Sequence, residues 1–335
     1  MCVIVAPGAE ALHDGVVDPD AALAEGVRSG GVRELARAIT AIENSPTGAP
    51  GLLDALGSPD QPAHVLGITG APGVGKSTMT SALVRAYRLR GKRVAVIAVD
   101  PSSPFSGGAL LGDRIRMQEH SGDPGVYIRS MASRGHLGGL NAAIGPVLRV
   151  CEVAGFDAVI LETVGVGQSE VEVAAAADTT LVLIAPGMGD GIQAAKAGIL
   201  EIGDIFVVNK ADRDGASTTA RELRHMIALG ERLPQEWEPP VHMTVASTGD
   251  GIEDVVLAAD EHLQWLVDTG NLARRREVRA REEILDTASA LVRAGLLEDR
   301  QGVDSLASEV AGGRMTAFEA AQRLLEEGPP GRMDA

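Results

Sequence analysis

"GITGAPGVGKST", residues 67–78, decides how this 335-residue chain folds. The stretch contains the spacing Gly70-x-x-x-x-Gly75-Lys76-Ser77, and it stands between an apolar run and a helical pattern. A strand, a glycine-rich loop and a helix in this order are the setting in which such a spacing forms a phosphate-binding loop. The sequence therefore predicts an α/β nucleotide-binding fold, and a glycine-rich turn that arises by chance is the alternative.

The residue types in this loop suit phosphate binding. Glycines let backbone N–H groups point at phosphate oxygens, and the helix that follows adds the positive end of its dipole. Lys76 is expected to reach the β- and γ-phosphates, and Ser77 to offer its hydroxyl to Mg²⁺. The residues predicted to hold the phosphates are Gly70, Gly73, Val74, Gly75, Lys76, Ser77 and Thr78.

A second motif, Asn209-Lys210-Ala211-Asp212, ends a later apolar run. A carboxylate at its fourth position can accept hydrogen bonds from guanine N1–H and from the 2-amino group, while the lysine stem lies along the base. Adenine lacks this pair of donors, so the wrong base would leave the acid unpaired. With the phosphate loop upstream, the motif predicts GTP and GDP as ligands. A loop that is merely rich in Asn and Asp is the alternative.

Three carboxylates are candidates for the chemistry of a nucleotide hydrolase, which needs Mg²⁺ and an oriented water. Asp100 and Glu162 each end an apolar run, and the strand ends of a parallel sheet face the ligand crevice. Asp113 follows a Gly-, Pro- and Ser-rich stretch that favours a mobile loop. A glutamate can reach Mg²⁺ through a bridging water, because this ion retains several waters. For each acid the alternative is a helix N-cap or a solvated loop residue.

Gly165, three residues after Glu162, completes a possible nucleotide switch. Its N–H is expected to meet the γ-phosphate, so "VGVGQSE" (164–170) is the segment expected to move on hydrolysis. The predicted catalytic residues are Lys76, Asp100, Glu162 and Gly165, and the predicted Mg²⁺ ligands are Ser77, Asp100, Asp113 and Glu162.

The composition limits the function classes. A net charge of −16 and a pI near 4.9 argue against nucleic acid or an anionic membrane as the partner. Cys2 and Cys151 form no CxxC pair, which fits a reducing, cytoplasmic location. The amino-terminal stretch lacks a basic region, and no apolar run reaches about 18 residues, so neither a signal peptide nor a transmembrane helix is expected.

Apolar runs alternate with helical patterns through the middle of the chain, starting near residues 64, 93, 125, 156, 179, 205 and 241. This alternation predicts an α/β fold with a mostly parallel sheet and helices on both faces. The predicted division is a tail and helical extension over 1–60, a P-loop GTPase domain over 61–252, a helical extension for dimerisation or partner binding over 253–328, and a disordered tail over 329–335. A helical extension that only caps the sheet is the alternative.

Six stretches taken in order resemble a known family. They are "GITGAPGVGKST", "VDPSSPFSGGALLGDRIRM", "YIRSMASRGHLGGL", "ILETVGVGQSE", "GDGIQAAKAGILEIGDIFVVNKAD" and "EWEPPV". Over roughly residues 30–270 the chain resembles the methylmalonyl-CoA mutase-associated GTPases, the MeaB/ArgK family. The resemblance implies a P-loop GTPase domain with helical extensions, usually in a homodimer. It also implies GTP hydrolysis that gates cofactor delivery to an adenosylcobalamin-dependent acyl-CoA mutase and protects or reactivates that enzyme.

The resemblance also implies roles for particular residues. By motif match, Lys76 and Ser77 bind the phosphates and Mg²⁺. The Mg²⁺-binding and catalytic acids are Asp100, Asp113 and Glu162, and the residues that read guanine are Asn209, Lys210 and Asp212. Residues 185–196 match a switch loop that communicates with the mutase. One departure stands in the last guanine loop, where Val245-Ala246 replaces the usual Ser-Ala. The N–H of Ala246 remains an expected contact of guanine O6, without the support of the serine.

Three alternatives would use the same phosphate loop. A nickel-type metallochaperone GTPase would favour a His-rich tract or paired cysteines, and the sequence has neither. A P-loop kinase needs an acceptor site, which no motif indicates, and the guanine motif argues against an ordinary ATP-using kinase. A signal-recognition GTPase needs a basic or Met-rich partner domain, which the net charge disfavours.

No Asp-x-His-x-x-Gly arrangement exists, so the partner is expected to hold the cobalamin. Methylmalonyl-CoA mutase is the first expectation for that partner, with isobutyryl-CoA and other acyl-CoA mutases left open.

Overall fold

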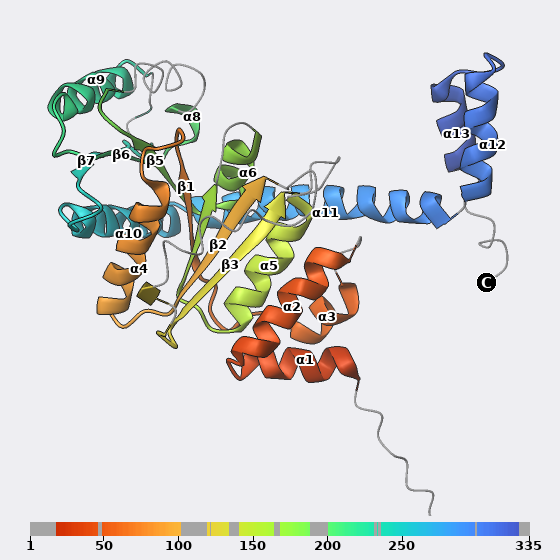
Figure 1. Ribbon diagram of the computed structural model, residues 1–335, viewed down its shortest axis with the longest axis horizontal. Coiled ribbons are helices and arrows are strands. Elements are labelled where there is room, and N and C mark those ends of the chain that lie inside the picture. Colours follow the sequence, from red (N-terminus) through yellow and green to blue (C-terminus); the bar gives the residue numbers. More distant parts are fainter. Residues whose placement is uncertain are drawn as a thin grey trace, which may run out of the picture.

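A seven-stranded parallel sheet forms the centre of the structure (Figure 1). The computed structural model describes residues 18–45, 49–101, 119–120, 122–133, 141–163, 168–187, 200–230, 233, 236–298 and 300–327. The strands are β1 (His64–Thr69), β2 (Val94–Pro101), β3 (Val126–Ser133), β4 (Ala158–Thr163), β5 (Thr179–Ile184), β6 (Ile205–Asn209) and β7 (Val241–Thr244). Their order across the sheet is β3-β2-β4-β1-β5-β6-β7, with parallel pairing between all neighbours. The predicted α/β class with a parallel sheet is confirmed.

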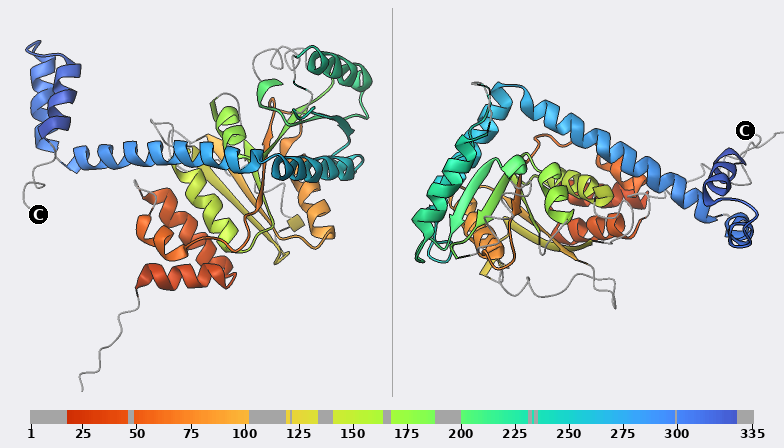
Figure 2. Two further views of the ribbon diagram at one scale, coloured as in Figure 1. Left: turned by 180° about the vertical axis from the view of Figure 1, so that it is seen from behind. Right: turned by 90° about the horizontal axis from the view of Figure 1, so that it is seen from above.

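Helices cover both faces of this sheet. They are α1 (Pro19–Arg28), α2 (Val32–Asn44), α3 (Pro50–Leu56), α4 (Lys76–Leu89), α5 (Asn141–Val153), α6 (Gln168–Ala176), α8 (Leu200–Ile202), α9 (Ala216–Ala228), α10 (Ile252–Asp268), α11 (Asn271–Glu298), α12 (Arg300–Ala311) and α13 (Ala317–Glu327). Helices α4 and α10 pack on one face, and α5, α6 and α9 pack on the other. The amino-terminal helices α1–α3 form a layer outside α5 (Figure 2).

Successive side chains along each strand point to opposite faces of the sheet, and this alternation decides which helices each side chain packs against. Val65 of β1 packs in the core that contains α5 and α6, whereas Leu66 and Ile68 pack with α4 and α10. In β4, Ile160 also packs in the core of α4 and α10. Side chains two residues apart in a strand lie on the same face. Glu162 therefore projects from β4 toward α4, the helix that begins at the phosphate loop.

A long helical arm leaves the body of the molecule. Helix α11 spans 28 residues, or about 42 Å at a rise of 1.5 Å per residue. It carries the hairpin of α12 and α13 away from the sheet (Figures 1 and 2). Among the described residues, no helix combines the length and the apolar character needed to cross a membrane.

Buried aspartates fasten the start of this arm to the sheet. Arg275 donates to both carboxylate oxygens of Asp204 at 2.9 and 2.7 Å. Arg276 donates to Asp178 at 2.7 Å, and Asp178 is fully buried. The same carboxylate accepts the backbone N–H of Val65 in β1. Because a buried charge that loses its partner is costly, these pairs fix where α11 begins relative to the strands.

Two neutral histidines complete this buried polar network. The hydroxyl of Thr179 lies 2.8 Å from His64 Nε2 and 2.8 Å from His262 Nδ1. His262 also stacks on Trp265, with ring centroids 5.8 Å apart. Burial lowers the pKa of His64 to about 4 and that of His262 to about 4. Both rings are therefore uncharged near neutral pH.

Acidification is expected to destabilise the fold through these histidines. Between the ordinary pKa of about 6.5 and the folded value, the unfolded chain binds more protons, so the free energy of unfolding falls as the pH drops. One pKa unit corresponds to about 1.4 kcal/mol. His262→Gln should flatten the fall between pH 6.5 and 4, as measured by urea unfolding at several pH values. The exposed His225→Gln is the control, and an unchanged slope in His262→Gln would contradict the assignment.

Candidate functional site

The phosphate loop runs from the end of β1 into α4 with a backbone that only glycine tolerates at two points. Gly70 has φ +139°, and a Cβ there would lie 2.3 Å from the carbonyl oxygen of Leu183. Gly75 has φ +99°, and a Cβ there would lie 2.6 Å from Asn209 Nδ2. Positive φ and close approach both exclude a side chain. The glycines found in the sequence are thus required by the shape of the loop.

The side chain of Lys76 extends back from the start of α4 toward the beginning of this loop. Its Nζ donates to the carbonyl oxygen of Gly70 at 2.5 Å and lies 3.5 Å from that of Ala71. The side chain is largely buried, at 8% exposure. An ammonium group beside the backbone of the phosphate loop is a positive point charge that can bind phosphate oxygens. The predicted role of Lys76 is compatible with this geometry.

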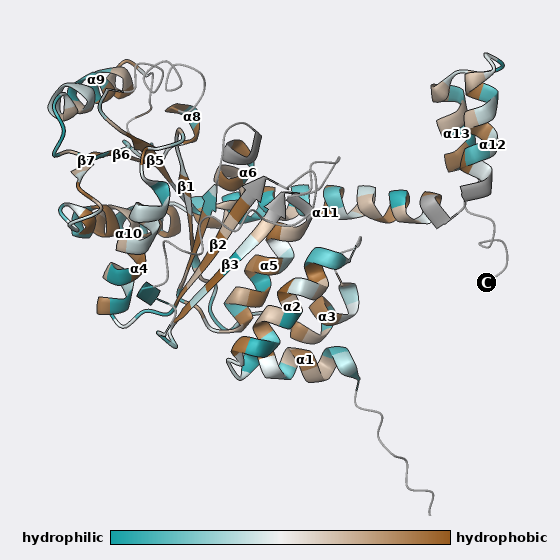
Figure 3. Cartoon of the chain, viewed as in Figure 1, coloured by the Kyte–Doolittle hydropathy of each residue, from teal (hydrophilic) through white to brown (hydrophobic). Residues whose placement is uncertain are grey.

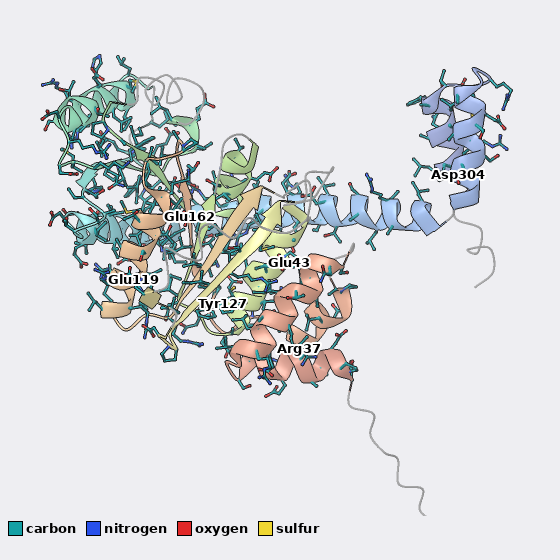
Figure 4. All side chains as sticks on the ribbon, viewed as in Figure 1. Arg37, Glu43, Glu119, Tyr127, Glu162 and Asp304 are labelled. Carbon is teal, nitrogen blue, oxygen red and sulfur yellow. The ribbon has the colours of Figure 1, made fainter. Side chains whose placement is uncertain are left out.

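Ser77 and Glu162 meet across the gap between α4 and β4. Ser77 Oγ donates to Glu162 Oε1 at 2.6 Å, and the carboxylate is 1% exposed. Figure 4 shows Glu162 in the body of the molecule, far from the arm that carries Asp304. The other oxygen of the carboxylate accepts the hydroxyl of Thr80 at 2.9 Å. Thr80 was not predicted from the sequence, although its position three residues after Ser77 puts both hydroxyls on one helix face.

This arrangement fits Mg²⁺ by its chemistry. The ion prefers hard oxygen ligands and is usually held through one or two carboxylates together with substrate phosphates and waters. Ser77 and Glu162 provide a hydroxyl and a carboxylate beside the phosphate loop. A hydroxyl that gives its proton to a carboxylate keeps its lone pairs for a cation. These two residues would therefore hold Mg²⁺ next to bound phosphates.

The side chain of Asn209 forms hydrogen bonds to the phosphate loop, to the end of β7 and to the loop after β7. Asn209 ends β6 and is 2% exposed. Its Nδ2 donates to the carbonyl oxygen of Val74 in the phosphate loop at 2.8 Å. Its Oδ1 accepts from Thr244 Oγ1 at 3.2 Å and from the N–H of Ala246 at 3.1 Å. A residue predicted to read the base thus also joins the phosphate loop to the end of β7 and to the loop after it.

The rest of the guanine motif follows Asn209 in a turn. Lys210 adopts φ +58° and donates from Nζ to the carbonyl oxygen of Gly73, so its stem crosses to the phosphate loop. Asp212 lies two residues on, and its side chain is exposed. An exposed carboxylate two residues after Lys210 is available to a base that lies along the lysine stem.

The departure at Val245 is accommodated by backbone hydrogen bonds. The N–H of Val245 donates to the carbonyl oxygen of Asp250, and its own carbonyl accepts from Thr248 and Gly249, each at 3.0 Å. The turn therefore keeps its shape without a serine hydroxyl. Because the N–H of Ala246 already donates to Asn209, contact with guanine O6 would require a shared, three-centre hydrogen bond.

A cavity of ≈ 530 Å³ lies between the phosphate-loop helix and the last guanine loop. Ser77 and Thr78 line one wall, and residues 246–249 line the other. It continues along α4 past Arg85, where Glu119 forms an ion pair with that arginine at 2.8 Å. Ligand sites commonly measure about 300–1,000 Å³. The cavity is thus of nucleotide size, and it is bounded by the end of the phosphate-loop motif at Ser77 and by the last guanine loop.

Several predicted residues fall outside this description. Asp113, Gly165 and residues 188–196 of the predicted switch loop lie outside the described residues. Asp100 lies at the end of β2, where its Cα pairs with that of Ala132 in β3. Its side chain is not among those described. The roles of these residues stay predictions.

Comparisons with known proteins agree with the motifs. Residues 35–301 match the family described as methylmalonyl Co-A mutase-associated GTPase MeaB. A protein of Pyrococcus horikoshii named as a GTPase is 42% identical over 307 residues, covering 91% of this chain and 97% of that one. The GTPase ArgK of Escherichia coli is 38% identical over 274 residues, covering 78% and 82%.

One solved structure agrees with the fold over almost the whole chain. It is titled a LAO/AO transport system kinase, and it superposes with a TM-score of 0.67 and 28% identity, covering 92% of this chain and 97% of that one. Family match, identity and coverage lead to one conclusion. The chain belongs to the methylmalonyl Co-A mutase-associated GTPase MeaB family, and it is a GTPase.

Proposed function

We propose that this GTPase is a chaperone of an adenosylcobalamin-dependent acyl-CoA mutase, gating cofactor delivery and protecting or reactivating the enzyme. Methylmalonyl-CoA mutase is the first candidate partner. The observation that carries the proposal is the family match over residues 35–301. The site supports it, because a GTP-driven chaperone needs a complete phosphate loop, and Lys76, Ser77 and Glu162 lie together at this one.

The phosphate end of the site would carry out the hydrolysis of GTP to GDP and phosphate. Lys76 would neutralise charge on the β- and γ-phosphate oxygens, and the backbone of the loop would hold them. Mg²⁺, when bound, supplies further positive charge between the same phosphates. Ser77 and Glu162 are its proposed holders, with Asp100 and Asp113 as further candidate acids. Gly165 is the proposed donor that senses the γ-phosphate.

The other end of the site would select guanine. Asp212 would accept hydrogen bonds from N1–H and the 2-amino group, and Lys210 would flank the ring. Asn209, buried and bonded on both sides of its amide, would keep the two loops at a fixed separation. The proposed contact of Ala246 with O6 would complete the set.

The helical arm is the proposed site of homodimerisation. Contiguous exposed apolar patches on a protein surface commonly mark protein–protein interaction sites. On α11 and α13, Ile284 is 67% exposed and Phe318 is 71% exposed. Figure 3 shows apolar residues along these helices, outside the layers that cover the sheet. We propose that a second copy covers them, in the cytoplasm, where the chain would also meet its mutase.

Addition of the cognate mutase is expected to raise GTP turnover by at least about tenfold, the effect of lowering the activation barrier by about 1.4 kcal/mol. The measurement is phosphate release by the full chain, with mutases co-purified from its host. An acyl-CoA enzyme that lacks cobalamin is the control and should have no effect. Turnover that no adenosylcobalamin-dependent mutase of the host alters would contradict the chaperone role.

A P-loop kinase is the second candidate, because the solved relative carries that title. A kinase would transfer the γ-phosphoryl group to an acceptor other than water. Hydrolysis and transfer are distinguished by incubating the chain with γ-³²P-labelled GTP and the co-purified proteins. We expect all label to appear as free phosphate, and label on a protein or small molecule would favour the kinase.

A further inference from the structure

Thr80 shares the buried carboxylate of Glu162 with Ser77. Thr80 is fully buried in α4, and its Oγ1 lies 2.9 Å from Glu162 Oε2. Ser77 Oγ lies 2.6 Å from Oε1 of the same carboxylate. Two hydroxyls one helical turn apart therefore engage the two oxygens of one glutamate. Neither the motifs nor the family match assigns Thr80 a role.

The hydroxyl of Thr80 has a choice of acceptors. Besides the carboxylate, its Oγ1 lies 3.1 Å from the carbonyl oxygen of Lys76, four residues earlier. A threonine hydroxyl carries only one proton. The carboxylate is the closer acceptor and the charged one, and charge-assisted hydrogen bonds are the stronger kind. Thr80 therefore donates to Glu162, and this contact sets it apart from helical threonines that bond only to a preceding carbonyl.

Two contacts are needed to orient this carboxylate. The terminal torsion of a glutamate is broad and has no sharp preferred angle. The bond from Ser77 restrains one oxygen and constrains the plane of the group less than a bond to each oxygen does. The second bond, from Thr80, fixes the plane and keeps Oε1 directed at Ser77. The lone pairs of the Ser77 hydroxyl then keep one direction, beside the phosphate loop.

We propose that Thr80 is a positioning residue of the magnesium site, which it serves by fixing the carboxylate of Glu162. This inference rests on the proposed magnesium-dependent GTP cycle. Thr80 touches neither metal nor nucleotide in this proposal, and it acts only through Glu162. Loss of its hydroxyl should therefore weaken the hold of Mg²⁺ on bound GDP and leave the nucleotide contacts themselves intact.

The test is the rate at which the full chain releases a fluorescent GDP analogue, in excess Mg²⁺ and in excess EDTA. Thr80→Val keeps the shape of the side chain and removes the hydroxyl, and it should release GDP about tenfold faster in Mg²⁺, the effect of losing about 1.4 kcal/mol. Its rate in EDTA should equal that of the unaltered protein. Thr80→Ser restores the hydroxyl and should bring the rate in Mg²⁺ back to within about twofold.

Thr219→Val is the matched control. Thr219 lies in α9, is 8% exposed and donates to the carbonyl oxygen of Gly215, four residues earlier, at 3.1 Å. The Thr219→Val variant loses a threonine hydroxyl from a helix, as Thr80→Val does, but at a position away from the magnesium site. Its rates of GDP-analogue release in Mg²⁺ and in EDTA should therefore match those of the unaltered protein. If Thr80→Val does not fold, Thr80→Ala replaces it in the same comparison.

A double variant shows whether Thr80 acts through the glutamate. Glu162→Gln alone should remove the slowing of release by Mg²⁺, and Thr80→Val added to it should change nothing further. Equal release by Thr80→Val and the unaltered protein in Mg²⁺, faster release in EDTA, or an additive effect in the double variant would overturn the inference. Failure of the proposed magnesium-dependent GTP cycle looks different, because Mg²⁺ would then have no effect on release from the unaltered protein.

Discussion

Lys76→Ala is expected to reduce GTP turnover by about 10²- to 10³-fold, the usual effect of removing one donor aimed at developing charge. The ammonium of Lys76 lies at the phosphate loop, where it donates to the carbonyl oxygen of Gly70 at 2.5 Å. Without it, charge on the transferred phosphoryl group loses its protein counterion. The measurement is phosphate release under saturating GTP and Mg²⁺, with thermal unfolding to verify that the variant is folded.

Lys92→Ala is the control for this loss of charge. Lys92 follows α4 and pairs with Asp157 at 3.3 Å, with its side chain 53% exposed. A surface pair of this kind contributes little to stability, and turnover should stay within about twofold of the unaltered protein. Turnover within about threefold of normal in Lys76→Ala would contradict the assignment of the phosphate loop.

Asp212→Asn is expected to exchange guanine for xanthine as the preferred base. A carboxylate only accepts hydrogen bonds, which suits the N1–H and 2-amino donors of guanine. An amide both accepts and donates, which suits the N1–H and the 2-oxo group of xanthine. The variant should lose at least about 10²-fold in affinity for GDP and gain affinity for XDP, because each mismatched pair leaves a donor or an acceptor without its partner once the base covers the site. Equilibrium titration with both nucleotides measures the exchange.

Asp214→Asn makes the same chemical change two residues away. Asp214 is exposed in the same turn, so a general effect of lost negative charge would appear in both variants. The specificity of Asp214→Asn should equal that of the unaltered protein. An Asp212→Asn protein that still prefers GDP to XDP would remove Asp212 from the base site.

The phosphate loop, the parallel sheet and the place of Glu162 could be predicted, because each has a local signal in the sequence. The spacing of Gly70, Gly75, Lys76 and Ser77 predicts its own strand–loop–helix setting, and the parallel sheet follows from apolar runs of strand length. Glu162 is another such case. Its place near the end of an apolar run, on the same face as Ile160, brings it to α4 once that helix covers the face.

The parts that could not be predicted depend on residues that meet only in the folded chain. Asn209 bonds to Val74, 135 positions earlier. Arg276 meets Asp178, 98 positions earlier, and this pair fastens the arm. Sequence spacing gives no register for such contacts, because they depend on how strands align in the sheet. The domain boundaries stay predictions, and so do the roles of Asp113 and Gly165, which lie outside the described residues.

Guanine-specific nucleotide binding is tested most directly by the ratio of GDP to ADP affinity for the full, unaltered chain, measured by equilibrium titration in Mg²⁺. GDP is expected to bind at least about 10³-fold more tightly than ADP, since adenine would leave the carboxylate of Asp212 without donors. Affinities for GDP and ADP within about tenfold of each other would contradict it.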